Sequence, residues 1–266
     1  MAHVEGNSLG VARVWIALRL AAAGWVKGHG RFFHSCSSPF SSEWAAAGAA
    51  RAAVHVGQGK DALQLNSNTC ERAYEAYVLS LCAEAVRSAG GTATLTGINT
   101  GPNPALVVLR GGPGDMASRG QDFCYVDCVF SRKRFEIHAD VVYEGQSGAN
   151  HEIDVSICEA AHAQDVRQSG RAPRTNKYLI AAIECKFYQS SPGVALARTF
   201  VGLIKDCSPN RLNAFVSNQT SRGLDSFLST TWAPKPFTDL TALNPQSERR
   251  FIANVEQVLR QWERSR

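Results

Sequence analysis

Two apolar segments near the middle of the chain carry charged side chains where buried strands are expected. Residues 151–157 read HEIDVSI and place Asp154 inside a β-branched run. Residues 179–188 read LIAAIECKFY and carry Glu184 and Lys186. Side chains two positions apart point to the same face of a strand, so Glu184 and Lys186 should emerge side by side. Because buried charge is costly unless it is paired or bound to metal, these residues predict a metal site for hydrolysis.

The chemistry that suits these residues is hydrolysis of a phosphodiester. The reaction needs a nucleophilic water and a stabilised leaving oxygen, and Mg²⁺ provides both while preferring oxygen ligands. Asp154, Glu184 and the main-chain carbonyl of Cys185 are therefore expected to bind Mg²⁺, and Mn²⁺ is an alternative ion for the same ligands. Lys186 is expected to hold the attacking water or to stabilise charge in the transition state.

Periodicity in the remaining sequence indicates the elements that must position this site. A helix is predicted over residues 69–89, capped by Ser67 or Asn68 and ended by Gly90-Gly91. Further predicted elements are strands at 93–98, 105–109, 123–130, 135–143 and 213–217, a polar connector at 159–177, and helices at 194–207, 223–229 and 247–264. This order predicts an α/β or α+β domain in which helices pack on a mixed sheet.

Charge and composition divide the chain into two parts. Residues 1–60 contain six Lys/Arg and two Asp/Glu, whereas residues 61–266 contain 22 and 21. The first part is interpreted as a poorly ordered or helical appendage, with a helix expected near residues 9–24. The second part is the expected catalytic domain, ending in a helix. Because that domain is nearly neutral, any binding of nucleic acid must come from a local basic patch.

The eight cysteines and the apolar segments bear on the compartment. No CxxC pair occurs, so a zinc ribbon or finger is not expected, and buried free thiols favour a reducing compartment such as the cytoplasm. The most apolar stretch, residues 11–26, contains Arg13 and Arg19. No membrane association is therefore expected.

The ordered set of acidic and basic residues resembles the PD-(D/E)xK nuclease superfamily. Its signature is a helix glutamate, then a strand aspartate, then (D/E)-x-K at the end of the next strand. Glu75, Asp154 and the Glu184-Cys185-Lys186 run match it in this order. The strand and helix at 213–228 are similar to those of methylation-directed type IV restriction nucleases. The resemblance covers about residues 67–230 and implies a restriction-endonuclease-like fold and a Mg²⁺-dependent endonuclease that cuts DNA.

Several alternatives remain open from the sequence. Glu71 lies one turn before Glu75 and is the other candidate for the helix acid, and His138 and His151 are either phosphate contacts or core histidines. A non-catalytic module of the same fold that binds DNA or a protein is the alternative function. A homodimer would supply two active sites for two strands. The candidate phosphate contacts are Arg171, Arg174, Arg198 and Lys205.

Overall fold

The computed structural model describes residues 69–175, 178–209, 211–230 and 234–265. The predicted appendage at residues 1–60, its helix near residues 9–24 and the predicted cap at Ser67 or Asn68 lie outside the described residues.

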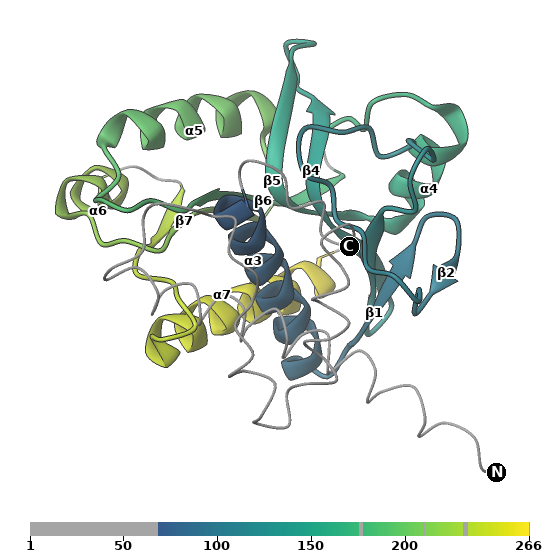
Figure 1. The fold of residues 1–266 in the computed structure, drawn as a ribbon, viewed down its shortest axis with the longest axis horizontal. Helices are drawn as coiled ribbons and strands as arrows, with labels where there is room; N and C mark the ends of the chain where they lie inside the picture. Colours follow the sequence, from purple (N-terminus) through teal and green to yellow (C-terminus); the bar gives the residue numbers. More distant parts are fainter. Residues whose placement is uncertain (1–68, 176–177, 210, 231–233, 266) are drawn as a thin grey trace.

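The described chain forms one mixed eight-stranded sheet in the order β2-β1-β3-β4-β5-β6-β7-β8 (Figure 1). Neighbouring strands are antiparallel from β2 to β6, and β6, β7 and β8 are parallel. The strands are β1 (Thr92–Gly97), β2 (Gly101–Pro102), β3 (Cys124–Phe130), β4 (Lys133–Glu144), β5 (Asn150–Glu159), β6 (Leu179–Lys186), β7 (Leu212–Ser217) and β8 (Lys235–Phe237).

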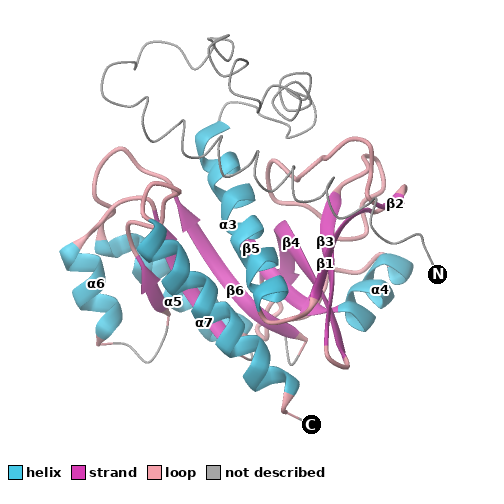
Figure 2. Cartoon of the chain, turned by 90° about the horizontal axis from the view of Figure 1, so that it is seen from below, coloured by secondary structure: helices cyan, strands magenta, loops and turns pink. Residues whose placement is uncertain are grey.

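Helices cover both faces of this sheet (Figure 2). They are α3 (Thr69–Ser88), α4 (Ala160–Ser169), α5 (Val194–Cys207), α6 (Arg222–Ser229) and α7 (Pro245–Glu263). Side chains of α3 and α7 share one buried apolar cluster with the sheet, and side chains of α4, α5 and α6 share a second. The predicted α+β class, a central mixed sheet flanked by helices, is confirmed.

Helix α3 is the central helix of the first cluster, and its composition explains this position. Its residues from Ala73 to Ala83 are all buried, which is typical of a helix enclosed by protein on every side. The sheet covers one side of α3, and α7 covers another, where the Tyr77 hydroxyl donates to Glu248 at 2.7 Å. The helix ends at Ser88, one residue before its predicted end, and Gly90 follows it with a φ of 93° that suits a glycine after a helix.

Two sequence predictions about local structure were wrong. Residues 105–109 are not a strand but a loop that makes one isolated bridge, between Val108 and Phe123. Leu106 is 51% exposed whereas its near neighbours Val108 and Leu109 are both buried, so burial does not alternate along this segment as it would in a strand. The polar connector at 159–177 contains helix α4, which buries only Ala160, Ala163 and Val166. Small side chains make this buried stripe weak in the sequence.

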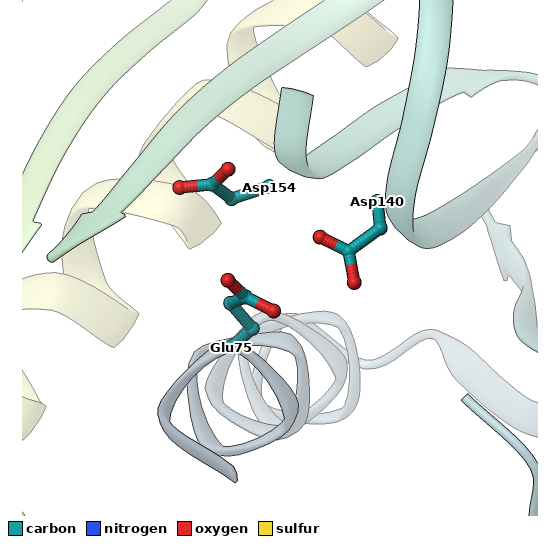
Figure 3. Close-up of side chains that lie close together, drawn as sticks. All are labelled: Glu75, Asp140 and Asp154. Carbon is teal, nitrogen blue, oxygen red and sulfur yellow. The ribbon is translucent and has the colours of Figure 1, made fainter. Parts of the chain in front are cut away.

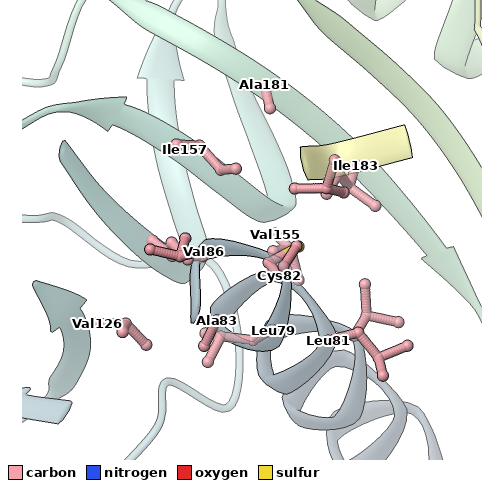
Figure 4. Close-up of a cluster of buried hydrophobic side chains, with 14 of the residues drawn as sticks. Leu79, Leu81, Cys82, Ala83, Val86, Val126, Val155, Ile157, Ala181 and Ile183 are labelled. Atoms are coloured by element: carbon pink, nitrogen blue, oxygen red, sulfur yellow. The ribbon is translucent and has the colours of Figure 1, made fainter. Parts of the chain in front are cut away.

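The packing of α3 gives a direct test of the fold. Leu81 of α3 is fully buried in the first apolar cluster (Figure 4). Leu81→Ala should lower the free energy of unfolding by about 2–5 kcal/mol, since it removes buried apolar volume and leaves a cavity. Ser88→Ala, at the exposed end of the same helix, should change it by less than about 0.5 kcal/mol. Urea unfolding measures both, and equal effects would contradict the placement of α3.

Candidate metal centre

The site begins where two antiparallel strands carry aspartates at the same level. Ala139 of β4 pairs with Val155 of β5, and Val141 pairs with Ile153, so Asp140 lies opposite Asp154. The backbone of Asp140 has a φ of 50°, in the left-handed region that aspartate adopts more readily than most residues. The local backbone and the strand register together direct both carboxylates to one place.

Helix α3 adds a third carboxylate from the side. Carboxylate oxygens of Glu75, Asp140 and Asp154 all lie within 4.8 Å of one another (Figure 3). The three residues are 6%, 0% and 8% exposed, respectively, so water cannot screen their mutual repulsion well. This cluster, called here the acidic triad, has the oxygen donors that Mg²⁺ and Mn²⁺ prefer.

Strand β6 places Glu184 and Lys186 beside the acidic triad. The Lys186 Nζ lies 2.6 Å from Oε1 of Glu184 and 3.3 Å from Oδ2 of Asp154, so the two side chains of the predicted (D/E)-x-K pair do lie on one face. The Cys185 N–H donates to the same Oδ2 of Asp154 at 2.8 Å. Cys185 thus contacts the site through its amide, and metal binding by its carbonyl stays a prediction.

Negative charge exceeds positive charge around this site. Five carboxyl groups interact electrostatically there, and the cations that face them are Arg72, Lys186 and, near Asp140, the buried Arg110. The Nη1 atom of Arg72 donates to Glu75 at 2.9 Å and to Asp140 at 2.7 Å. The five carboxyl groups are those of Glu75, Asp140, Glu152, Asp154 and Glu184.

The imbalance changes the pKa values of the carboxyl groups. Burial, with help from Asp140 and Asp154, raises the pKa of Glu75 to about 9, although Arg72 opposes the rise. Burial likewise raises the pKa of Asp140 to about 7, and that of Glu184 to about 7. Without a further cation, these groups therefore keep protons that ordinary carboxyl groups lose near pH 4.

Lys186 behaves differently from the acids around it. Burial lowers its pKa, but Asp154 and then Glu184 outweigh burial, so the pKa of Lys186 lies above its ordinary value. The side chain is therefore an ammonium ion at neutral pH. It can donate hydrogen bonds and stabilise negative charge, but it cannot take a proton from water as a base.

One atom of the acidic triad fits a metal ligand particularly well. Oδ2 of Asp140 is buried and accepts no hydrogen bond, while Oδ1 of the same carboxylate is held by Arg72. Oε1 of Glu152, at the edge of the site, is also buried without a donor. A buried carboxylate oxygen without a donor is costly, and a divalent cation would satisfy it. The donor set therefore fits Mg²⁺ or Mn²⁺, held by Glu75, Asp140 and Asp154.

The structure distinguishes among the remaining candidate residues. Glu71 is exposed, so Glu75 is the helix acid that enters the site. His138 is fully buried against Glu136 at 2.9 Å, and His151 bonds Asp206 at 2.6 Å, so each histidine has a partner within the fold. The candidate phosphate contacts are exposed and make no described contact with the acidic triad; they are Arg171, Arg174, Arg198 and Lys205.

The sequence reasoning missed Asp140 and Arg72. Asp140 lies in the segment IHADVVY, where a carboxylate interrupts an apolar, β-branched run just as Asp154 does. The same criterion applied to this strand would have identified it. Arg72 had no such signal, because a single arginine near the start of a helix is ordinary surface composition.

Comparisons with known proteins gave no relative. No family model, no curated protein and no solved structure matches the chain. Among the described helices, none combines the length and the apolar character needed to cross a membrane.

The raised pKa values predict how stability depends on pH. In metal-free protein, Tm should fall as the pH rises from about 5 to 9, because folded Asp140 and Glu184 keep their protons up to about pH 7 and Glu75 up to about pH 9. The unfolded chain has already released these protons by about pH 5, so a rising pH favours unfolding. Saturating Mg²⁺ should abolish the fall, because the cation then replaces the protons.

Thermal unfolding across this pH range, with and without Mg²⁺, measures the effect. Asp140→Asn removes one of the crowded acids and should flatten the fall. Glu256→Gln, which breaks a surface pair with Arg260, is the matched control and should leave the fall unchanged. A Tm that does not vary with pH between about 5 and 9 in the metal-free wild type would contradict the raised pKa values.

Proposed function

We propose that this protein is a metal-dependent nuclease that hydrolyses phosphodiester bonds of DNA. The observation that carries the proposal is the buried acidic triad beside a charged lysine, with Oδ2 of Asp140 lacking a donor. A structural cluster of acids would be expected to have a cation or donor for each oxygen. Here the acids exceed their partners, and the missing positive charge is that of a bound cation.

The roles of the residues follow from their contacts. Glu75, Asp140 and Asp154 would hold the cation, which when bound polarises a phosphoryl oxygen and lowers the pKa of a coordinated water. Lys186, fixed by Glu184 and Asp154, donates hydrogen bonds to the attacking water or to the oxygens that gain charge. Glu184 fixes Lys186 through its contact at 2.6 Å and stays a predicted ligand of the cation.

The order and spacing of the acids supports nuclease chemistry over other hydrolysis. Glu75 on α3, Asp154 on β5 and the Glu184-Cys185-Lys186 run on β6 follow the pattern of the PD-(D/E)xK superfamily. A mixed sheet flanked by helices agrees with that resemblance. DNA is the substrate we propose on the same resemblance, with Mg²⁺ as the metal and a homodimer as the form that cuts both strands.

We also propose that the protein acts in the cytoplasm. Six cysteines have side chains that the structure describes, and all are buried and free: Cys82, Cys124, Cys128, Cys158, Cys185 and Cys207. A fold that keeps its thiols reduced and enclosed suits a reducing compartment.

Alanine variants test the catalytic roles. Lys186→Ala and Asp154→Ala should each lower the rate of cleavage of plasmid and linear DNA, in Mg²⁺ or Mn²⁺, by about 100-fold or more. Lys186→Ala removes the donor next to the reacting group, and Asp154→Ala removes a metal ligand. Lys235→Ala, an exposed lysine on β8, is the matched control and should keep the wild-type rate.

Two results would count against this proposal. Undiminished cleavage by both site variants would exclude these residues from catalysis. Salt-dependent DNA binding by wild-type protein that binds neither Mg²⁺ nor Mn²⁺ in calorimetry would instead favour a non-catalytic DNA-binding module of the same fold.

A further inference from the structure

Arg72 holds a position that conflicts with metal binding. Its Nη1 atom lies 2.9 Å from Oε2 of Glu75 and 2.7 Å from Oδ1 of Asp140, two members of the acidic triad. A Mg²⁺ ion takes carboxylate oxygens at about 2.0–2.1 Å and demands octahedral geometry. A guanidinium and a dication on the same two buried carboxylates repel each other strongly. Each cation therefore weakens the binding of the other, even though Arg72 holds Oδ1 of Asp140 and leaves Oδ2 without a donor.

The other donor edge of the Arg72 guanidinium is not used within the described chain. No described residue accepts a hydrogen bond from Nε or Nη2, and Nε is buried. Nε and Nη2 form a planar fork that matches two oxygens of a phosphate. A buried donor without an acceptor is costly, so the present position of Arg72 satisfies the carboxylates better than it satisfies the arginine itself.

The surroundings of Arg72 suit a side chain that moves a short distance. The side chain is 15% exposed and begins one helical turn before Glu75, so a released guanidinium stays beside the site. The glycine-rich loop 111–114 lies next to the Arg72 guanidinium, because a side chain added at Gly112 would place its Cβ atom 3.8 Å from Nη2. Gly114 of that loop is hydrogen-bonded to β4, where its N–H donates to the carbonyl of Asp140 at 3.0 Å.

We propose that Arg72 is an exchangeable counter-ion of the metal centre. It holds Glu75 and Asp140 in metal-free protein, yields them to a divalent cation, and then binds the phosphate of the substrate phosphodiester. This inference rests on the proposed function and adds to it a residue that links metal binding to phosphate binding. The exchange breaks only ion pairs and hydrogen bonds, and the charge that Arg72 leaves is replaced by the charge of the metal.

The first experiment compares thermal stability and Mg²⁺ affinity, neither of which needs activity. Arg72→Gln should lower the Tm of metal-free protein by several degrees, because the acids lose their counter-ion, and the loss should disappear in saturating Mg²⁺. By linkage, calorimetry should find Mg²⁺ bound about 10-fold more tightly by Arg72→Gln than by wild type. Arg134→Gln is the charge-matched control. Arg134 lies on β4, the strand of Asp140, and its exposed ion pair is with Asp127 of β3.

The outcomes separate this inference from the proposed function. An equal loss of Tm with and without Mg²⁺, or weaker Mg²⁺ binding by Arg72→Gln, would show that Arg72 stays on its carboxylates and would overturn the exchange. A wild-type protein that does not bind Mg²⁺ at all would overturn the metal centre itself. Arg72→Lys, which keeps the charge but not the fork, should fold like wild type and serves if Arg72→Gln does not fold.

The second experiment tests the phosphate half of the inference. The Lys186→Ala variant serves as the parent, because its DNA cleavage in Mg²⁺ is blocked. Adding Arg72→Gln to this parent should weaken binding of a short DNA duplex about 10-fold, and adding Arg72→Lys should weaken it by a smaller factor. Arg134→Gln in the same background should bind like the parent. Equal affinity of the Arg72→Gln and Arg134→Gln proteins for the duplex would overturn the role of Arg72 in phosphate binding.

Discussion

The feature on which the site depends is the burial of like charges between two strands and a helix. Asp140 and Asp154 face each other across the β4–β5 pair, and Glu75 closes the third side. When all three carboxylates are ionised in a buried site, they repel one another. Two features reduce this repulsion: raised pKa values keep protons on Glu75 and Asp140, and the positive charges of Arg72 and Lys186 contact the carboxylates. Both remedies leave the acids incompletely neutralised, and this is the physical basis for expecting a cation.

The two hydrophobic clusters explain why the acids do not move apart. Ala139 and Val155 belong to the cluster under α3, whereas Val141 and Ile153 belong to the cluster under α5. The strands therefore contribute to different cores on either side of Asp140 and Asp154. Because both ends of this strand pair are fixed by packing, a separation of the carboxylates would disturb buried apolar contacts on both faces of the sheet.

The sequence could predict local structure and faces, but not which strands meet. The helix at 194–207 was predicted with its observed bounds, because Pro192-Gly193 precede a clear helical period. The common face of Glu184 and Lys186 followed from the two-residue period of a strand. Asp140 joined the site through the register of β4 on β5, a non-local property that no periodicity encodes. Arg72 joined it through the docking of α3, which is also tertiary.

A second buried acid on β4 has more hydrogen-bond partners than Asp140. Glu136 lies four residues before Asp140 and is also buried. Arg167 donates to both of its carboxylate oxygens, at 2.6 and 2.7 Å, and His138 contacts it at 2.9 Å. Burial raises the pKa of Glu136, but these partners outweigh burial and lower the pKa below its ordinary value.

Glu136 and Asp140 therefore differ in partners rather than in burial. Glu136 accepts hydrogen bonds from both Nη atoms of Arg167 and contacts His138. Asp140 accepts a hydrogen bond from Nη1 of Arg72, which also donates to Glu75, and its Oδ2 has no donor. Both oxygens of the buried Glu136 carboxylate accept hydrogen bonds, so burial on β4 does not by itself leave a carboxylate oxygen without a donor, as Oδ2 of Asp140 is. The deficit at Asp140 is one that the proposed cation would offset.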